Sequence, residues 1–292
     1  MSSQLKLIVA KATVIADTLG DSLFGGLDVA KAASVLAAVD GLAPDVLASV
    51  VDSLLREDLS EPEAVAAPFE AEKDWHFLTV VDIGAGTTDT ATFLLRAHPN
   101  WERGKIMLVP GSRASLDKAG DEVDRNLREW LRRELSAQIQ PSDLATLDAW
   151  LGATIRDHKL KLFRDEIIEV SFGGATAIID LEQFIAIGEV KSLEEEMAGL
   201  LGRFFEAMPA NLVQKIEEKG GVRLLLSGGG ASLPIARGLA DKLFLIGAKR
   251  IQTRITDVRP DWESSKDDDF RAIYPQLAVA IGGASPFLPE GS

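Results

Sequence analysis

Apolar residues along the chain change their spacing near residue 60. Through LDVAKAASVLAAV and APDVLASVVDSLL they recur at helical spacing, which predicts two helices separated by Gly41 and Pro44. After the acidic, proline-bearing stretch SEPEAVAAPFEAEKD, short apolar runs alternate with tight turns. FLTVVD, TATFLL and KIMLVP each predict a strand. The pattern therefore indicates a helical first part followed by a mixed α/β part.

The rest of the chain alternates between predicted helices and strands. Amphipathic spacing predicts one helix over 119–135 and another over 142–163, with Ser142 as the cap of the second. EIIEVSF and TAIIDL, joined by a Gly-rich turn, predict a β-hairpin. Ser192 and Glu195 have the spacing of a capping box and predict the start of a long helix. VRLLLS predicts a buried strand, and SLPIARGLADKLF a helix after it.

Charge and composition narrow the classes of partner. The 292 residues carry a net charge of −14 with scattered Lys and Arg, which argues against binding to nucleic acid or to an acidic membrane surface. Cysteine is absent, which excludes disulfides and fits a reducing cytoplasm. The first twenty residues place lysines inside an apolar run, unlike a signal peptide or a membrane span. We therefore expect a cytoplasmic protein without nucleic-acid or membrane partners.

A Gly-rich turn between two predicted strands gives the strongest chemical signal. Residues 80–95 read VVDIGAGTTDTATFLL, without the Gly-Lys-Ser/Thr of a P-loop, the third glycine of a dinucleotide fingerprint or a nucleophile elbow. Polar and apolar residues alternate after Asp89, which predicts a β-hairpin. Such a turn could hold a metal nucleotide, with backbone amides around the phosphate and carboxylates around hydrated Mg²⁺. A plain hairpin turn is the alternative.

A second glycine cluster lies in VRLLLSGGGASLPIARGLADKL, between a predicted strand and a predicted helix. Three consecutive glycines allow a ribose or a ring to approach the backbone closely, next to a helix N-terminus. We predict that the two Gly-rich turns face one another across a cleft, because the carboxyl ends of neighbouring strands meet at one edge of an α/β sheet.

Together these motifs resemble the actin-type ATPases. DIGAGTTD is similar to their second phosphate loop, and LLLSGGGASLP is similar to their adenosine motif. SEPEAVAAPF resembles a segment of the heat-shock protein 70 chaperones. AGDEVDRNL, HKLKLF and DDDFRAIYPQLAVAIGGA follow in the order that this family has. The resemblance covers roughly residues 60–285.

The resemblance implies an α/β fold of the actin-like ATPase (ribonuclease H-like) type, mainly its second lobe. Residues 1–75 would be a helical remnant of the first lobe and 76–292 the second lobe, with an α+β insertion subdomain at about 126–195. ATP or ADP and Mg²⁺ are the implied cofactors, and an ATP-binding, chaperone-type protein is the implied function. A non-catalytic scaffold or polymer-forming module, with protein partners or self-association, is one alternative. A sugar-kinase-type or acetate-kinase-type relative is another.

The resemblance also implies roles for individual residues. Asp82 and Glu61 would hold the metal, and with Thr87 they would form the catalytic group. The residues implied to contact the nucleotide are Gly84, Ala85, Gly86, Thr88, Asp89, Lys159, Gly228, Gly229, Gly230, Ser232 and Asp269.

Several positions depart from the family pattern. Ala85 replaces a glycine, which requires a negative φ. Ser232 stands where the chaperones have an arginine that stacks on adenine. Pro275 replaces a glycine, so the closing helix must begin or kink there. The residues before Asp82 contain no recognisable first phosphate loop or catalytic lysine, and this leaves ATP hydrolysis open.

Overall fold

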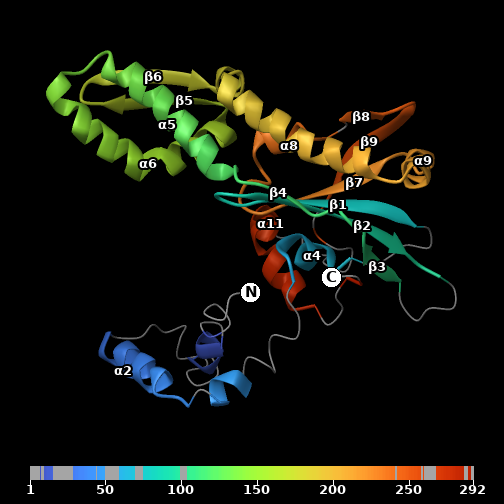
Figure 1. Cartoon of the computed structure of the whole chain (residues 1–292). Coiled ribbons are helices and arrows are strands. Elements are labelled where there is room, and N and C mark those ends of the chain that lie inside the picture. Colours follow the sequence, from blue (N-terminus) through green and yellow to red (C-terminus); the bar gives the residue numbers. More distant parts are fainter. Residues whose placement is uncertain are drawn as a thin grey trace. The chain divides into compact units, whose positions relative to one another are not determined.

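A computed structural model describes residue 7 and residues 10–15, 29–43, 45–49, 59–69, 75–98, 104–240, 242–257, 259, 268–285 and 289–290 (Figure 1). The chain divides into two compact units, Met1–Leu59 and Ser60–Ser292. The first unit contains α2 (Val29–Asp40), which confirms the first predicted helix. Residues 45–49 of the second predicted helix are helical, and the rest of it lies outside the described residues.

The second unit contains a mixed, seven-stranded sheet, so the predicted α/β class is confirmed. The strand order is β3-β2-β1-β7-β9-β8, with β4 paired to β2 off this path. β1 pairs antiparallel with β2 and parallel with β7, and β7 pairs parallel with β9. The strands are β1 (His76–Ile83), β2 (Thr88–Arg96), β3 (Lys105–Leu108), β4 (Ala114–Leu116), β7 (Val222–Ser227), β8 (Leu243–Ile246) and β9 (Lys249–Thr256).

The central strands β1 and β7 are buried along nearly their whole length because helices cover both faces of the sheet. Figure 1 shows α8 (Gly188–Ala207) and α9 (Ala210–Glu218) on one face, and α4 (Glu61–Ala66) and α11 (Asp268–Gly283) on the other. α4 and α11 pack closely, since a Cβ added at Gly282 would lie 1.6 Å from the Ala64 carbonyl oxygen. α4 therefore belongs with the sheet, although it lies before residue 75.

α11 continues through Pro275. Of the two outcomes predicted for this position, a helix start is excluded because α11 begins at Asp268. The Pro275 carbonyl oxygen accepts hydrogen bonds from the Gly228 N–H at 2.9 Å and from Ser227 Oγ at 3.1 Å. The proline therefore lies where α11 contacts the second glycine turn.

A helical insertion separates β4 from β7 (Figure 1). Its hairpin pairs Ile168 with Ile179 and packs on α5 and α6, as predicted for EIIEVSF and TAIIDL. Its elements, including the 3-10 turn η2, are α5 (Gly120–Ser136), η2 (Pro141–Asp143), α6 (Leu144–Asp165), β5 (Ile167–Phe172), β6 (Ala175–Asp180), α7 (Leu181–Ile185) and α8 (Gly188–Ala207).

Both helix starts predicted in the insertion from capping residues are wrong. Ser142 lies inside η2, since the fixed φ of Pro141 favours a turn one residue earlier. Ser192 lies inside α8, which begins at Gly188. Val190 is buried, so the earlier start extends the apolar face of the helix toward its N-terminus.

The helix predicted for SLPIARGLADKLF is also wrong. The structure has only the short α10 (Pro234–Arg237), followed by a turn and β8. α10 ends at Gly238. A Cβ added at Gly238 would lie 2.7 Å from Glu194 Oε1. The Phe244 ring packs 5.2 Å from that of Phe205, so tertiary burial favours the strand. No helix among the described residues is long and apolar enough to cross a membrane.

Replacing Gly228 by alanine should destabilise the second unit, since an added Cβ would lie 2.4 Å from the Ile83 carbonyl oxygen and φ is +81°. Overpacking and backbone strain together should lower the free energy of unfolding by about 2–4 kcal/mol. At Gly229 a Cβ would meet no atom within 4 Å, so Gly229→Ala is the matched control. Chemical denaturation measures both, and equal stabilities would contradict this packing.

Candidate functional site

The first Gly-rich turn connects β1 to β2, as predicted. The two strands are antiparallel and Ile83 pairs with Thr88, so the turn consists of residues 84–87. The Gly84 N–H donates to the Thr87 carbonyl oxygen at 2.9 Å and closes the turn. No helix begins at Thr87 or Thr88, so a strand-to-helix phosphate loop is excluded at this position.

The second Gly-rich turn lies directly beside the first. β1 and β7 are parallel with Asp82 opposite Ser227, so both turns leave the same edge of the sheet. The Gly230 N–H donates to the Ile83 carbonyl oxygen at 2.8 Å. The predicted proximity is confirmed, but a hydrogen bond joins the turns where a cleft was predicted.

The glycines at this edge serve two different purposes. Gly228 and Gly230 are required by packing, since a Cβ at either would lie 2.3–2.4 Å from atoms of Ile83. Gly86 and Gly229 have no positive φ, are exposed, and a Cβ at either would meet nothing within 4 Å. The fold does not require glycine at these two positions, and their small size leaves room beside the backbone.

The N-terminus of α5 supports the first turn. The Gly120 N–H donates to the Gly84 carbonyl oxygen at 3.2 Å, and the Asp121 N–H donates to that of Ala85 at 2.7 Å. Ala85 has no positive φ, so it meets the condition for replacing glycine. The α5 amides and the turn carbonyls satisfy one another and hold the turn in one conformation.

Three amides of the same turn have no such partner. The backbone N–H groups of Ala85, Gly86 and Thr87 donate no hydrogen bond to any described residue. All three residues are exposed, so these donors face solvent. An exposed turn with consecutive unpaired N–H groups offers partial positive charge to an anion.

Asp82 lies buried at the end of β1, directly before this turn. Burial, a hydrogen bond with the Glu61 carboxyl, and the charges of Glu61 and Asp89 raise the pKa of Asp82 to about 7, against the opposing effect of the Ser227 hydroxyl. Asp82 Oδ1 has no hydrogen-bond partner among the described residues. Burial therefore leaves one oxygen of the Asp82 carboxyl without a partner beside the Glu61 carboxyl.

A cavity of about 550 Å³ lies beside Glu61 and Asp89. Thr87 Oγ1 donates to Asp89 Oδ2 at 3.0 Å within its wall. The lining residues come from α4, β2 and β4 and the loops beside them: Ser60, Glu61, Pro62, Thr87, Asp89, Thr90, Arg113, Ala114 and Ser115.

Arg113 is the one basic residue among those that line this cavity, and the sequence analysis missed it. Its half-exposed guanidinium pairs with the fully buried carboxylate of Glu63. Glu63 also accepts hydrogen bonds from the backbone and the hydroxyl of Ser60. Burial alone would raise the pKa of Glu63, but the hydrogen bonds from Ser60 and Arg113 together outweigh it and lower this pKa. The S-x-x-E pattern of a capping box marks this arrangement in the sequence. The ion pair fixes a positive charge near Glu61 and Asp89.

The structure does not bring every predicted residue into the site. Thr88 is buried and its hydroxyl donates to the Lys118 carbonyl oxygen at 2.8 Å. Lys159 lies on α6 and pairs with Asp124 at 2.6 Å, so its ammonium is engaged within the insertion. Ser232 is exposed beyond the second turn. Asp269 lies in the first turn of α11, and its side chain is outside the described residues.

Asp82→Asn should flatten the dependence of stability on pH. The pKa of Asp82 is raised in the folded chain, so the folded state holds this proton more tightly than the unfolded state. The free energy of unfolding should therefore fall as pH rises from about 4 to about 7, by at most about 1.4 kcal/mol per pH unit. Denaturation across this range measures the slope. Asp143→Asn, at an exposed position, should keep the wild-type slope; an unchanged slope in Asp82→Asn would contradict the assignment.

No family model matches the chain, and no curated protein matches its sequence.

Proposed function

We propose that this chain binds ATP or ADP with Mg²⁺ at the sheet edge where the two Gly-rich turns meet. The observation that carries the proposal is the row of unpaired N–H groups at Ala85, Gly86 and Thr87, directly after the buried Asp82. Successive backbone N–H groups in a turn are a common phosphate-binding arrangement. A phosphate placed there would also lie near a magnesium ion held by the carboxylates.

The acidic residues around Asp82 fit a hydrated magnesium ion. No three His, Asp or Glu side chains of the described chain are placed to hold a metal directly. Mg²⁺ usually keeps several of its waters and takes one or two carboxylates, so Asp82 and Glu61 are a suitable pair. The partnerless Oδ1 of Asp82 and its raised pKa both favour a cation as the missing partner. Bound Mg²⁺ would neutralise the phosphate charge and displace the proton from Asp82.

Positive charge and open backbone support the rest of the site. Arg113 lines the cavity beside Glu61 and Asp89, where its guanidinium can pair with a phosphate oxygen. Gly86 and Gly229 leave room beside the first and second turns, respectively. We assign the phosphates to the first turn and the nucleoside to the side of Gly229. Lys159 can contact a ribose only if it leaves Asp124, so we give it no role in the resting site.

The fold family of the second unit is part of the same proposal. We propose that the second unit is the second lobe of an actin-like ATPase, similar to the nucleotide-binding domain of heat-shock protein 70 chaperones. Supporting features are the β1–β2 hairpin that carries the phosphate turn, the helical insertion after it, and the parallel return to β7 with the second turn. Chaperone activity, with protein partners or self-association, follows from this resemblance alone.

Gly86→Val should abolish or weaken Mg-ATP binding without unfolding the chain. The valine side chain would cover the unpaired amides, whereas its Cβ would meet no atom of the fold within 4 Å. We expect the dissociation constant from calorimetry to rise at least tenfold, which is about 1.4 kcal/mol. Gly152→Val on α6 is the matched control, since its Cβ also meets nothing. Unchanged affinity in Gly86→Val would remove the basis of the proposal.

The chain should turn over bound ATP very slowly. Positioning and charge stabilisation supply most of the catalysis in phosphoryl transfer, and the residues before Asp82 contain no recognisable first phosphate loop. Each missing preorganised donor costs about a hundredfold or more in rate. We therefore expect micromolar-to-millimolar affinity, about −4 to −8 kcal/mol, with phosphate release close to background. Fast release that Asp82→Ala abolishes would contradict this and indicate catalytic groups within residues 1–59.

A further inference from the structure

Strand register places four polar residues in one row across the edge of the sheet where the Gly-rich turns lie. Ser227 of β7 pairs with Asp82 of β1. Asp82 also pairs with Asp89 of β2, which pairs in turn with Ser115 of β4. Neighbouring strands lie about 4.8 Å apart, so the row is about 14 Å long. The second turn lies at its β7 end, the first turn in its middle, and β4 at its other end.

Arg113 lies at the β4 end of this row. It directly precedes β4, and its guanidinium contacts Glu63 of α4, so its side chain lies on the face of the sheet that α4 covers. Glu61 also belongs to α4 and makes a hydrogen bond with the Asp82 carboxyl on that face. Arg113 and the proposed magnesium ligands therefore occupy the same side of the sheet edge.

The guanidinium of Arg113 is held in place and still has donors to spare. Its anchor is the fully buried Glu63 carboxylate, which is itself held by the backbone and the hydroxyl of Ser60. Of the N–H donors that a guanidinium has, only one on Nη2 of Arg113 donates to a described residue. The side chain is 50% exposed and lines the cavity beside Asp89. A positioned cation with free donors therefore lies next to the first turn.

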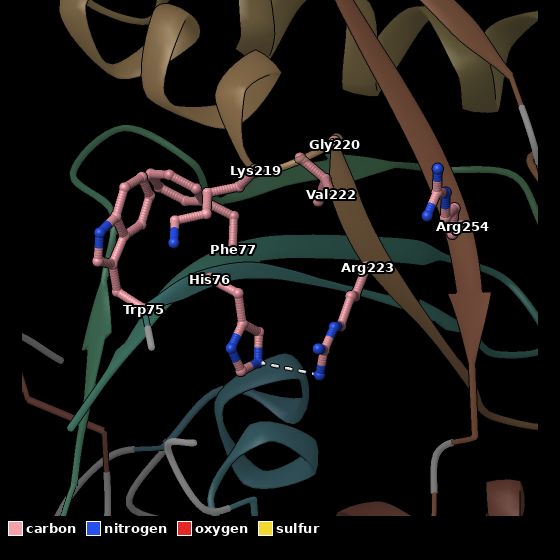
Figure 2. A pocket seen from close by; sticks show the side chains of 9 residues that line it. Trp75, His76, Phe77, Lys219, Gly220, Val222, Arg223 and Arg254 are labelled. Atoms are coloured by element: carbon pink, nitrogen blue, oxygen red, sulfur yellow. Dashed lines mark hydrogen bonds between the residues drawn. The ribbon is translucent and has the colours of Figure 1, made fainter. Parts of the chain in front are cut away.

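Other basic side chains of this unit are paired or placed elsewhere. Lys118, which follows β4, pairs with Glu196 of α8 at 2.6 Å. Arg223 lies at the opposite end of the central strands, where Figure 2 shows it beside His76, with Arg223 Nη1 at 3.5 Å from His76 Nε2. Among the residues that line the cavity beside the first turn, Arg113 alone is basic. It is therefore the side chain best placed to neutralise a phosphate there.

We propose that Arg113 binds the terminal phosphate of a nucleoside triphosphate and makes the site selective for ATP over ADP, with Glu63 as the positioning residue that holds its guanidinium. The inference rests on the proposed nucleotide function. With the nucleoside beside Gly229 at the β7 end of the row and the phosphates on the first turn, the last phosphate lies nearest to β4. A diphosphate in the same position ends one phosphate earlier. It therefore lacks the strong, directional hydrogen bonds that a fixed guanidinium makes to phosphate oxygens.

Calorimetric titration of the whole chain with Mg-ATP and with Mg-ADP measures this selectivity. We expect ATP to bind at least about tenfold more tightly than ADP, which is the effect of one or two hydrogen bonds between charged groups. Equal affinities for the two nucleotides would overturn the inference and leave the proposed function in place. Binding of neither nucleotide would overturn the proposed function, and this inference with it.

Arg113→Lys makes the test specific to this side chain. The ammonium keeps a positive charge beside the buried Glu63 but lacks the planar fork, so the preference for ATP should fall at least about threefold while ADP affinity stays unchanged. Arg128→Lys, at an exposed position on α5, is the matched control and should change neither affinity. An equal loss of ATP and ADP affinity in Arg113→Lys would indicate a merely structural role and would overturn the inference.

A double variant carries the test if circular dichroism shows that Arg113→Lys is not folded. Glu63→Gln combined with Arg113→Gln removes both members of the ion pair, so no unpaired charge is left buried. This variant should bind ATP and ADP with affinities within about threefold of each other, because the donors to the terminal phosphate are gone. A preference for ATP as large as that of the wild type would overturn the inference.

Discussion

The parallel pairing of β1 with β7 is the constraint on which the candidate site depends. It brings Asp82 opposite Ser227, although 144 positions separate them in the chain. Close backbone contact maintains this pairing at the sheet edge, where Gly228 and Gly230 pack on Ile83 with no room for a Cβ. A larger side chain at either position would push the two turns apart. It would thus separate the unpaired amides of the first turn from the second turn. Gly228 and Gly230 therefore serve the packing of this edge.

Burial gives this edge its chemical character. A carboxyl at the surface would stay ionised at neutral pH, whereas Asp82, enclosed beside Glu61, has a pKa near 7. The proposed magnesium ion would compete with a proton for the oxygen atoms of Asp82, so its affinity should rise with pH. Glu63 behaves differently because its buried carboxylate is already paired with Arg113 and the Ser60 backbone. Asp82 and Glu63 are both buried, yet their pKa values shift in opposite directions because their partners differ.

Sequence reasoning succeeded where the local pattern determines the outcome. The alternation after Asp89 sufficed for the hairpin, and strand-end geometry sufficed to place the second turn beside the first. It failed where tertiary contacts decide. The Lys159–Asp124 ion pair depends on how α5 packs on α6, which no short window of sequence reveals. The strand around Phe244 replaced a predicted helix because burial against Phe205 outweighs helical spacing. Arg113 was missed because its partner Glu63 lies fifty positions away.

The same two strands have different kinds of ionisable side chain near their two ends. Carboxylates and amides gather where β1 and β7 end, and arginines and lysines gather where they begin. An eight-residue strand such as β1 spans about 25 Å, which exceeds the Debye length of about 8 Å at physiological salt. Direct electrostatic coupling between the two ends is therefore screened. Any influence of one end of the strands on the other must pass through the strands and the helices packed on them, whose buried contacts resist small shifts.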